Sequence, residues 1–231
     1  MLDPAITVFE MPISAKKHLP WFYYAGRWLV KRLLSLTMFE LKGIENVPVE
    51  GPLIIVSNHL ALADPPIVGA VIPRRMVFMA KEELFRYGPV ISYFVKSFGA
   101  FPVKRGQPAV HAVRKAMDVL SQGKVLVIFP EGMRSRSGKL KEAFPGVAAI
   151  AIASGAPVLP VGISGTEDMD RISWIFRRPH VRVNIGRPFC PGVRKGHPGK
   201  LELRAVTDDI MNHIARLLPE GYRGRYGRDN S

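Results

Sequence analysis

The sequence predicts one α/β domain built on a mostly parallel, mixed β-sheet that is covered by helices. Short runs of aliphatic residues recur along the chain, as expected for strands that are buried on both faces. Amphipathic helical stripes alternate with these runs, which is the order found when helices connect parallel strands. No internal repeat or linker interrupts the 231 residues, a length that suits a single hydrophobic core.

Residues 1–40 are predicted to form an N-terminal arm followed by an amphipathic, membrane-associating helix. The helix is expected from Trp21 to Phe39, with one apolar face made of Phe22, Ala25, Leu29, Leu33 and Leu36. Basic and polar residues share the opposite face: Arg27, Lys31 and Ser35. Aromatic residues of the kind found at lipid headgroups flank the stripe: Trp21, Tyr23, Tyr24 and Trp28. The pattern fits a helix in a membrane interface, and it fits equally a first helix packed on the protein's own core.

Residues 41–218 are predicted to form the α/β domain. The expected strands are Leu53–Val56, Val77–Ala80, Ala100–Val103, Val125–Phe129, Val158–Ile163 and Val181–Ile185. Two helical stripes are clear: Val110, Val113, Met117 and Leu120, and then Leu203, Val206, Ile210, Ile214 and Leu217. Residues 219–231, with several arginines among glycines, are expected to form a flexible basic tail.

Charge and composition restrict the classes of partner. The 33 Lys and Arg against 19 Asp and Glu leave a net charge of +14, which indicates either nucleic acid or an anionic membrane surface. The aromatic residues gather in one amphipathic segment instead of interleaving with basic residues, so nucleic acid is disfavoured. The single cysteine excludes a disulfide framework and a cysteine-based zinc cluster.

Neither a transmembrane helix nor a cleavable signal peptide is expected. The longest uncharged run, 143–166, contains three prolines and predicts a buried helix followed by a buried strand. The first twenty residues lack an unbroken apolar stretch and include two acids. We therefore expect the chain to remain on the side on which it is made.

The best candidate for chemistry is the pair His59 and Asp64, directly after the first buried strand. Ligands of parallel α/β sheets bind where strands end, and a turn between the two residues would bring the carboxylate back to the imidazole. A carboxylate on one ring nitrogen leaves the other free to act as a general base. The alternatives are structural: Asp64 precedes two prolines and suits a helix N-cap, and a lone histidine is more often structural than catalytic.

Basic residues follow two further strands, in the segments 99–105 and 129–135. If these strand ends meet at one edge of the sheet, Arg105 and Arg134 form an anion pocket beside His59. The sequence contains no nucleophile elbow, no glycine-rich nucleotide loop and no histidine spacing typical of a metal site. The chemistry indicated is therefore direct transfer assisted by a base, with no covalent nucleophile and no metal.

These residues resemble the motifs of the glycerophospholipid acyltransferases, and most of all the bacterial 1-acylglycerol-3-phosphate (lysophosphatidic acid) acyltransferases. Asn58-His59 with Asp64 resembles the NHxxxxD signature, and Phe129–Ser135 resembles FPEGTRS. Three further segments match in order: Gly99–Arg105, Phe144–Gly146 and Pro157–Val161. Two departures from the family's motifs stand out. Met133 replaces the usual threonine of FPEGTRS, and Phe101-Pro102 bends the segment Gly99–Arg105.

The resemblance implies that His59 deprotonates the free hydroxyl of lysophosphatidic acid, while Asp64 orients the ring. The acyl group would come from acyl-CoA or an acyl carrier protein, without a cofactor, and the product would be phosphatidic acid for phospholipid synthesis. Because such an acceptor and product reside in a bilayer, the resemblance also implies a peripheral enzyme on an anionic membrane surface, at the cytoplasmic face of the cell membrane. Substrate-binding roles are implied for Asn58, Lys81, Lys104, Arg105, Glu131, Gly132 and Arg134.

Other functions remain open from sequence. The same chemistry on glycerol 3-phosphate or another lysolipid is the main alternative within the family. A thioesterase would use His59 on water and would not need a phosphate pocket. A basic membrane-binding protein without catalysis is the alternative from a different class.

Overall fold

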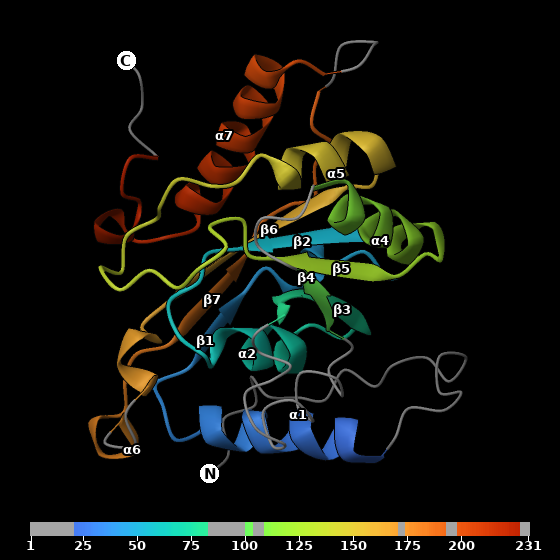
Figure 1. Cartoon of the computed structure of the whole chain (residues 1–231). Coiled ribbons are helices and arrows are strands. Elements are labelled where there is room, and N and C mark those ends of the chain that lie inside the picture. The colour runs from blue at the N-terminus through green and yellow to red at the C-terminus, as the bar shows by residue number, and fades with distance from the viewer. Residues whose placement is uncertain (1–20, 83–99, 104–108, 171–173, 193–197, 227–231) are drawn as a thin grey trace.

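A computed structural model gives the fold of residues 21–82, 100–103, 109–170, 174–192 and 198–226 (Figure 1). Its strands are β1 (Glu40–Lys42), β2 (Leu53–Ser57), β3 (Met76–Lys81), β4 (Phe101–Val103), β5 (Val125–Ile128), β6 (Val158–Ser164) and β7 (Arg182–Ile185). Its α-helices are α1 (Trp21–Leu34), α2 (Asp64–Val71), α4 (Ala109–Ser121), α5 (Gly146–Ser154), α6 (Trp174–Arg177) and α7 (Lys200–Arg216). Three 3₁₀ turns are η3 (Ile44–Asn46), η5 (Glu167–Asp170) and η6 (Glu220–Tyr222).

The strands form one seven-stranded sheet in the order β1-β7-β6-β2-β5-β3-β4. The five strands from β6 to β4 are parallel to one another, whereas β7 is antiparallel to β6 and parallel to β1. The predicted mostly parallel, mixed sheet is therefore confirmed, and no bound of the six expected strands differs by more than one residue. The strand β1 was not expected, because three residues with only partial burial leave no apolar run in the sequence.

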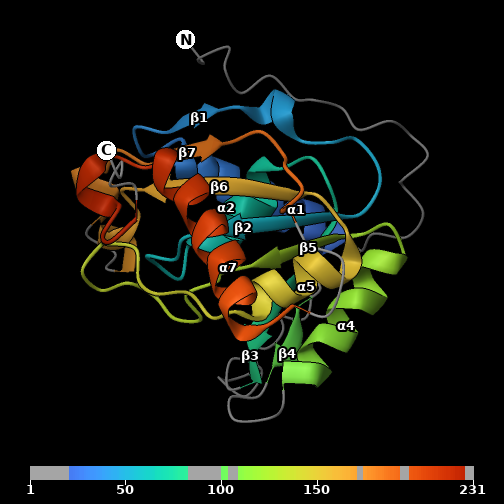
Figure 2. The same ribbon diagram turned by 90° about the horizontal axis from the view of Figure 1, so that it is seen from above.

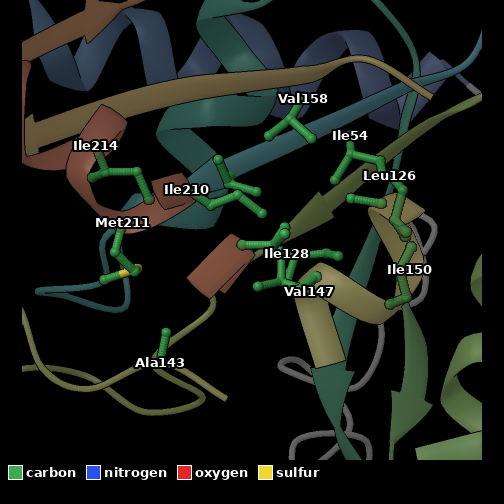
Figure 3. Packing of buried hydrophobic residues seen from close by; sticks show 14 of the residues in the cluster. Ile54, Leu126, Ile128, Ala143, Val147, Ile150, Val158, Ile210, Met211 and Ile214 are labelled. Carbon is green, nitrogen blue, oxygen red and sulfur yellow. The ribbon is translucent and has the colours of Figure 1, made fainter. Parts of the chain in front are cut away.

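Helices cover both faces of the sheet. On one face lie α4, α5 and α7, and on the other lie α2 and, beyond it, α1 (Figures 1 and 2). Alternate residues of β2 divide between two cores, because Ile54 and Val56 pack toward α5 and α7 while Leu53 and Ile55 pack toward α2. Figure 3 shows the first core, where Ile210 and Ile214 of α7 approach the strand side chains. The uncharged run from 143 forms the buried helix α5 and strand β6, as predicted.

The helix α1 confirms the predicted apolar stripe but turns it away from the protein. Its inner side carries Tyr23 and Leu34, both buried, and Arg27, whose guanidinium donates to the carbonyls of Ala70 and Ile72 at the C-terminal end of α2. The outer side exposes large apolar side chains: Tyr24, Trp28, Leu29 and Leu33. The helix ends at Leu34, before the predicted end at Phe39, and Leu36 is exposed just beyond it. Arg27, from the predicted basic face, thus packs on α2, where its cation complements the helix C-terminus.

Burial lowers the pKa of Lys31, and the neighbouring charge of Arg27 lowers it further. Both effects agree with an inward-facing basic edge. No helix in the described part of the chain is long and apolar enough to cross a bilayer.

The predicted flexible tail is wrong for residues 219–226, which pack on the domain. Tyr226 is buried, and the carbonyl of Tyr222 accepts a hydrogen bond from the backbone N–H of Leu140 at 2.8 Å. Two tyrosines that find apolar contacts hold this segment, although its arginines and glycines suggested a solvated chain. Residues 1–20, the apolar stretch 90–95 and residues 227–231 lie outside the described residues.

Candidate active site

His59 and Asp64 meet at the carboxyl end of β2. The His59 Nδ1 atom lies 2.8 Å from Oδ2 of Asp64. The chain turns between them, because the same Oδ2 accepts the backbone N–H groups of Leu60 at 2.6 Å and Ala61 at 2.8 Å. Asp64 therefore folds its own loop and contacts the imidazole with one oxygen atom.

Asp64 is the first residue of α2, and its carboxylate does not cap that helix. The residue before the helix is Ala63, and no side chain caps the helix N-terminus by a hydrogen bond. The helix nevertheless favours the negative charge, since its N-terminal end carries positive potential. The predicted N-cap role is thus replaced by three hydrogen bonds directed back into the loop and the ring.

The second carboxylate oxygen has a partner that the motifs did not indicate. Thr166, which is fully buried after β6, donates from Oγ1 to Oδ1 of Asp64 at 2.6 Å. A fully buried carboxylate is costly unless it is well paired, and here both of its oxygens are occupied. Thr166 lies 102 residues from Asp64 in sequence, so no local spacing could have revealed the contact.

The backbone of His59 is held from both sides by the loop after β5. The His59 N–H donates to Oε1 of Glu131 at 3.1 Å, and its carbonyl accepts the N–H of Ser135 at 2.7 Å. The sequence predicted that the segments after these two strands, with His59 in one and residues 129–135 in the other, meet at one edge of the sheet. This is confirmed, because β2 and β5 are neighbouring strands. Neither Ser135 nor this backbone clamp was anticipated from the sequence.

The His59 ring is fixed in orientation as well as in position. The ring of Phe129 packs against it with 4.5 Å between centroids and 32° between planes. Because the Asp64 carboxylate can only accept, it selects the tautomer with the proton on Nδ1 and leaves a lone pair on Nε2. The arrangement can accept a proton at Nε2 and stabilise the resulting imidazolium through Asp64.

Glu131 supports the loop rather than presenting a free charge. Its Oε2 accepts the backbone N–H of Lys141 at 2.9 Å, so its two oxygens join His59 to the far end of the loop. Burial raises the pKa of Glu131, and the two backbone hydrogen bonds oppose that rise. This carboxylate is buried and occupied by backbone donors, which differs from the predicted direct role in substrate binding.

Asn58 also differs from its predicted role. Its amide nitrogen donates to the carbonyl of Ile163 at 2.8 Å, and its oxygen accepts the Ile163 N–H at 2.8 Å. The side chain thereby copies a strand's backbone pairing and ties the end of β2 to β6. With its side chain buried and both functional groups engaged, Asn58 positions the next residue, His59.

Gly132 provides a tight turn within the loop after β5. Its φ of 64° is in the left-handed region, and a Cβ atom here would lie 2.8 Å from Cε2 of Phe144. Met133, which stands where the family's motif usually has threonine, is exposed, so this difference leaves no unfilled space in the core. Exposed Leu62, Met133 and Phe144 give the loops around His59 an apolar rim.

Arg134 is half-buried in this loop, and its carbonyl accepts a hydrogen bond from Nζ of Lys141 at 3.4 Å. Lys104 and Arg105 lie outside the described residues, as does the side chain of Lys81 at the end of β3. Among the residues with described positions, no cluster of three or more His, Cys, Asp or Glu is arranged to hold a metal ion.

Comparison with known proteins identifies the family. The family model described as Acyltransferase matches residues 38–164, which include β1 to β6 and both loops at His59. The chain belongs to this acyltransferase family. Its computed structure resembles the crystal structure of the 1-acyl-sn-glycerophosphate acyltransferase PlsC from Thermotoga maritima, with a TM-score of 0.64 and 25% identity. That match covers 89% of this chain and 82% of the other.

Relatives of this acyltransferase differ in the acceptor that their names give. It is 29% identical over 175 residues to a 1-acyl-sn-glycerol-3-phosphate acyltransferase of Bacillus subtilis, covering 75% of this chain and 84% of that protein. It is also 29% identical over 199 residues to a lyso-ornithine lipid O-acyltransferase of Pseudomonas aeruginosa, covering 86% and 65%. A chloroplastic 1-acyl-sn-glycerol-3-phosphate acyltransferase of Brassica napus is 29% identical over 201 residues, covering 85% of this chain and 55% of that protein.

Proposed function

We propose that this acyltransferase moves a fatty acyl group from a thioester to the sn-2 hydroxyl of 1-acylglycerol 3-phosphate, forming phosphatidic acid. The observation that carries the proposal is the His59–Asp64 pair, with 2.8 Å between ring nitrogen and carboxylate, in a chain of this family. The Bacillus relative, of which this chain covers 84%, is named for the same acceptor.

In the proposed reaction, Nε2 of His59 takes the proton of the acceptor hydroxyl. The hydroxyl oxygen attacks the thioester carbonyl carbon, a C–O bond forms, and the C–S bond then breaks. The imidazolium returns its proton to the departing thiolate, so the enzyme ends in its starting state. Asp64 stabilises the imidazolium, and base assistance of this kind contributes about 10²–10⁴-fold to rate. The donor is acyl-CoA or an acyl carrier protein, and the reaction needs no metal or organic cofactor.

The acceptor phosphate is proposed to bind at the loop after β5. Arg134 offers a planar guanidinium suited to phosphate oxygens, and Lys81, Lys104 and Arg105 are proposed to add positive charge. Glu131 and Gly132 act indirectly in this proposal, since they shape the loop that carries Arg134. The exposed Leu62, Met133 and Phe144 are suited to contact the lipid's acyl chain or the bilayer surface.

We further propose that α1 docks the enzyme on an anionic membrane surface, on the cytoplasmic face of the cell membrane. Its outer side exposes three aromatic or aliphatic side chains of the type that enter the interface: Trp28, Leu29 and Leu33. Arg32, also on the exposed side, adds attraction of about 1 kcal/mol to anionic lipid. Arg27 ties α1 to α2, the helix that begins with Asp64, so docking and catalysis share one rigid unit.

A second acceptor has specific support. The lyso-ornithine lipid O-acyltransferase of Pseudomonas aeruginosa matches 86% of this chain. The His59–Asp64 chemistry acts on any suitably placed hydroxyl, so acceptor choice depends on the residues that bind the headgroup. Acylation of an acceptor without a phosphate would depend less on Arg134.

Competing acceptors in one reaction test the proposal. Purified protein receives palmitoyl-CoA, or palmitoyl carrier protein, with equal amounts of lysophosphatidic acid, glycerol 3-phosphate and lyso-ornithine lipid, and mass spectrometry identifies the acylated products. We expect phosphatidic acid to dominate, and Arg134→Gln to reduce its formation more than that of an acylated ornithine lipid. Predominant acylation of ornithine lipid or glycerol 3-phosphate would assign the enzyme to that acceptor instead.

A further inference from the structure

The short helix α6 presents a large apolar side chain to solvent from a firmly anchored turn. Trp174 is 8% exposed and holds α6 against the domain, whereas Phe176, two residues later, is 89% exposed. Ile175 is exposed beside it. An isolated exposed residue needs no explanation, but an aromatic side chain held out by a buried anchor and followed by two arginines is typical of a surface contact.

The residue that follows α6 adopts a conformation that favours glycine. Arg178 has a φ of 46°, the one positive φ among the described residues other than glycine, and its N–H bonds to the carbonyl of Trp174 at 3.0 Å. A helix commonly ends in this way with glycine, because a Cβ atom is strained there. Arg177 and Arg178 are both exposed, and within the described ranges no ion pair joins either guanidinium to a carboxylate. The strained position therefore keeps a cation available at the surface.

The segment after α6 is joined to the segment after α1. The N–H of Met38 donates to the carbonyl of Pro179 at 3.0 Å, and the N–H of Val181 donates to the carbonyl of Met38 at 3.1 Å. Both helices consequently lie at one end of the molecule, and α7 lies at the other (Figure 1). Met38 itself is exposed, so apolar side chains continue from Leu36 through Met38 toward α6.

The helix α6 also follows the candidate active site closely along the chain. Thr166, which donates to Asp64, immediately precedes η5, and η5 contacts α6. α6 is thereby linked through η5 to the residue that holds Asp64. This geometry suits an acceptor whose hydroxyl must reach Nε2 while its acyl chain stays in a bilayer.

We propose that α6 and Arg178 form a second membrane contact, in which Phe176 enters the lipid headgroup region and Arg177 and Arg178 bind lipid phosphates. The inference rests on the proposed function, since a bilayer-resident acceptor gives the contact its purpose. An anionic bilayer fits better than an acidic protein, because the apolar and cationic side chains of α6 continue the apolar outer side of α1. Two contacts at separate points fix the tilt of the enzyme on the surface, which α1 alone does not.

Vesicle binding of the full chain tests this contact. Flotation with phosphatidylcholine vesicles, with and without phosphatidylglycerol, compares wild type with Phe176→Ser, Arg178→Gly and Leu201→Ser. The control is matched, because Leu201 is also 89% exposed but begins α7 at the opposite end. We expect Phe176→Ser to weaken partitioning about tenfold on both lipid mixtures. Leu201→Ser should bind as wild type does.

Arg178→Gly separates a membrane role from a folding role. Glycine relieves the strain at φ 46°, so the melting temperature should rise or hold while binding to the phosphatidylglycerol vesicles falls severalfold. Unchanged vesicle binding in both α6 variants, or an equal loss in Leu201→Ser, overturns the proposal. Loss of turnover with a carrier-protein donor, with vesicle binding intact, would assign α6 to that protein instead. Acyl transfer by the wild-type preparation is measured separately, so failure of the proposed function is not confused with failure of this contact.

Discussion

At the scale of single residues, the site depends on how completely Asp64 is held. One of its oxygens accepts from the His59 ring and from two backbone N–H groups, and the other accepts from Thr166. A carboxylate fixed in this way sets the tautomer and plane of the imidazole before substrate arrives, which removes a reorganisation step from catalysis. Thr166 is therefore a positioning residue for the proposed base.

Replacing Thr166 by valine tests that role. The change keeps the shape but removes the hydroxyl donor, so Oδ1 of Asp64 stays buried without a partner at a cost of about 1–3 kcal/mol in stability. We expect kcat to fall about tenfold with little change in KM, because the Asp64–His59 geometry loosens. Steady-state kinetics at several pH values measure the effect, and Thr166→Ser should restore activity. A lower melting temperature with unchanged kcat would show that Thr166 supports only the fold.

Much of the site was predictable at this scale, and the limits have physical causes. The strand ends and the turn before α2 follow from local patterns, so the meeting of His59 and Asp64 was predicted. Asn58 and Glu131 were expected to touch substrate, yet both bind backbone groups. Local sequence indicates that a polar side chain lies near a site. It does not show whether the backbone of a distant strand or loop will occupy the hydrogen-bonding groups of that side chain.

At the scale of elements, the fold follows from the strand patterns, whereas the ends of the chain depend on tertiary contacts. Each buried strand has a continuous apolar run that the sequence displays. The stripe of α1 was also predicted, with two directions left open, and tertiary contacts decide between them: the C-terminal carbonyls of α2 bind Arg27, and the apolar side faces outward. The segment 219–226 is held by tyrosines whose partners lie far away in sequence.

The segment 219–226 supports the loop after β5, and Tyr222 allows this to be tested through pH. Its hydroxyl donates to Glu167, and its carbonyl holds Leu140 near the end of that loop. Burial, followed by the bond to Glu167, raises the pKa of Tyr222 from 10.0 to about 12. A raised pKa favours the protonated, folded form, so this stabilisation is complete below pH 10 and is lost as pH rises through about 12.

Tyr222→Phe should therefore flatten the pH dependence of unfolding in that window. Thermal unfolding is followed between pH 9 and pH 12, a range set by the pKa values above. We expect the difference in melting temperature between wild type and variant to shrink as pH rises across this range. An advantage that stays constant through alkaline pH would mean that Tyr222 contributes by packing alone.

At the scale of the whole molecule, net charge and exposed apolar surface act together. In the proposed docking, the excess of 14 positive charges attracts anionic lipid over a distance of about 10 Å at moderate salt, and apolar side chains then hold the enzyme at the interface. The sheet lies between α1 and α2 on one side and the core under α5 and α7 on the other (Figure 1). In the proposed docking, contacts through α1 and α6 set the orientation of His59, at the end of β2, relative to the membrane.

The salt dependence of vesicle binding distinguishes the electrostatic part of docking from the apolar part. Raising sodium chloride should weaken wild-type binding to anionic vesicles, since screening shortens the reach of the positive charges. Trp28→Ser should weaken binding on neutral vesicles as well, because Trp28 is 60% exposed on the outer side of α1. Flotation across a salt series measures both effects. Binding that does not respond to salt would contradict the electrostatic part of the account.

The most direct measurement of the central claim is thiol release from palmitoyl-CoA in mixed micelles, with and without lysophosphatidic acid, for wild type and His59→Ala. We predict release that requires the acceptor and falls at least about 10²-fold in the variant, as expected when a general base is lost. If release does not occur with palmitoyl-CoA, the same comparison is made with palmitoyl carrier protein. Release that ignores the acceptor would indicate a thioesterase, and acceptor-dependent release that survives His59→Ala would contradict the account.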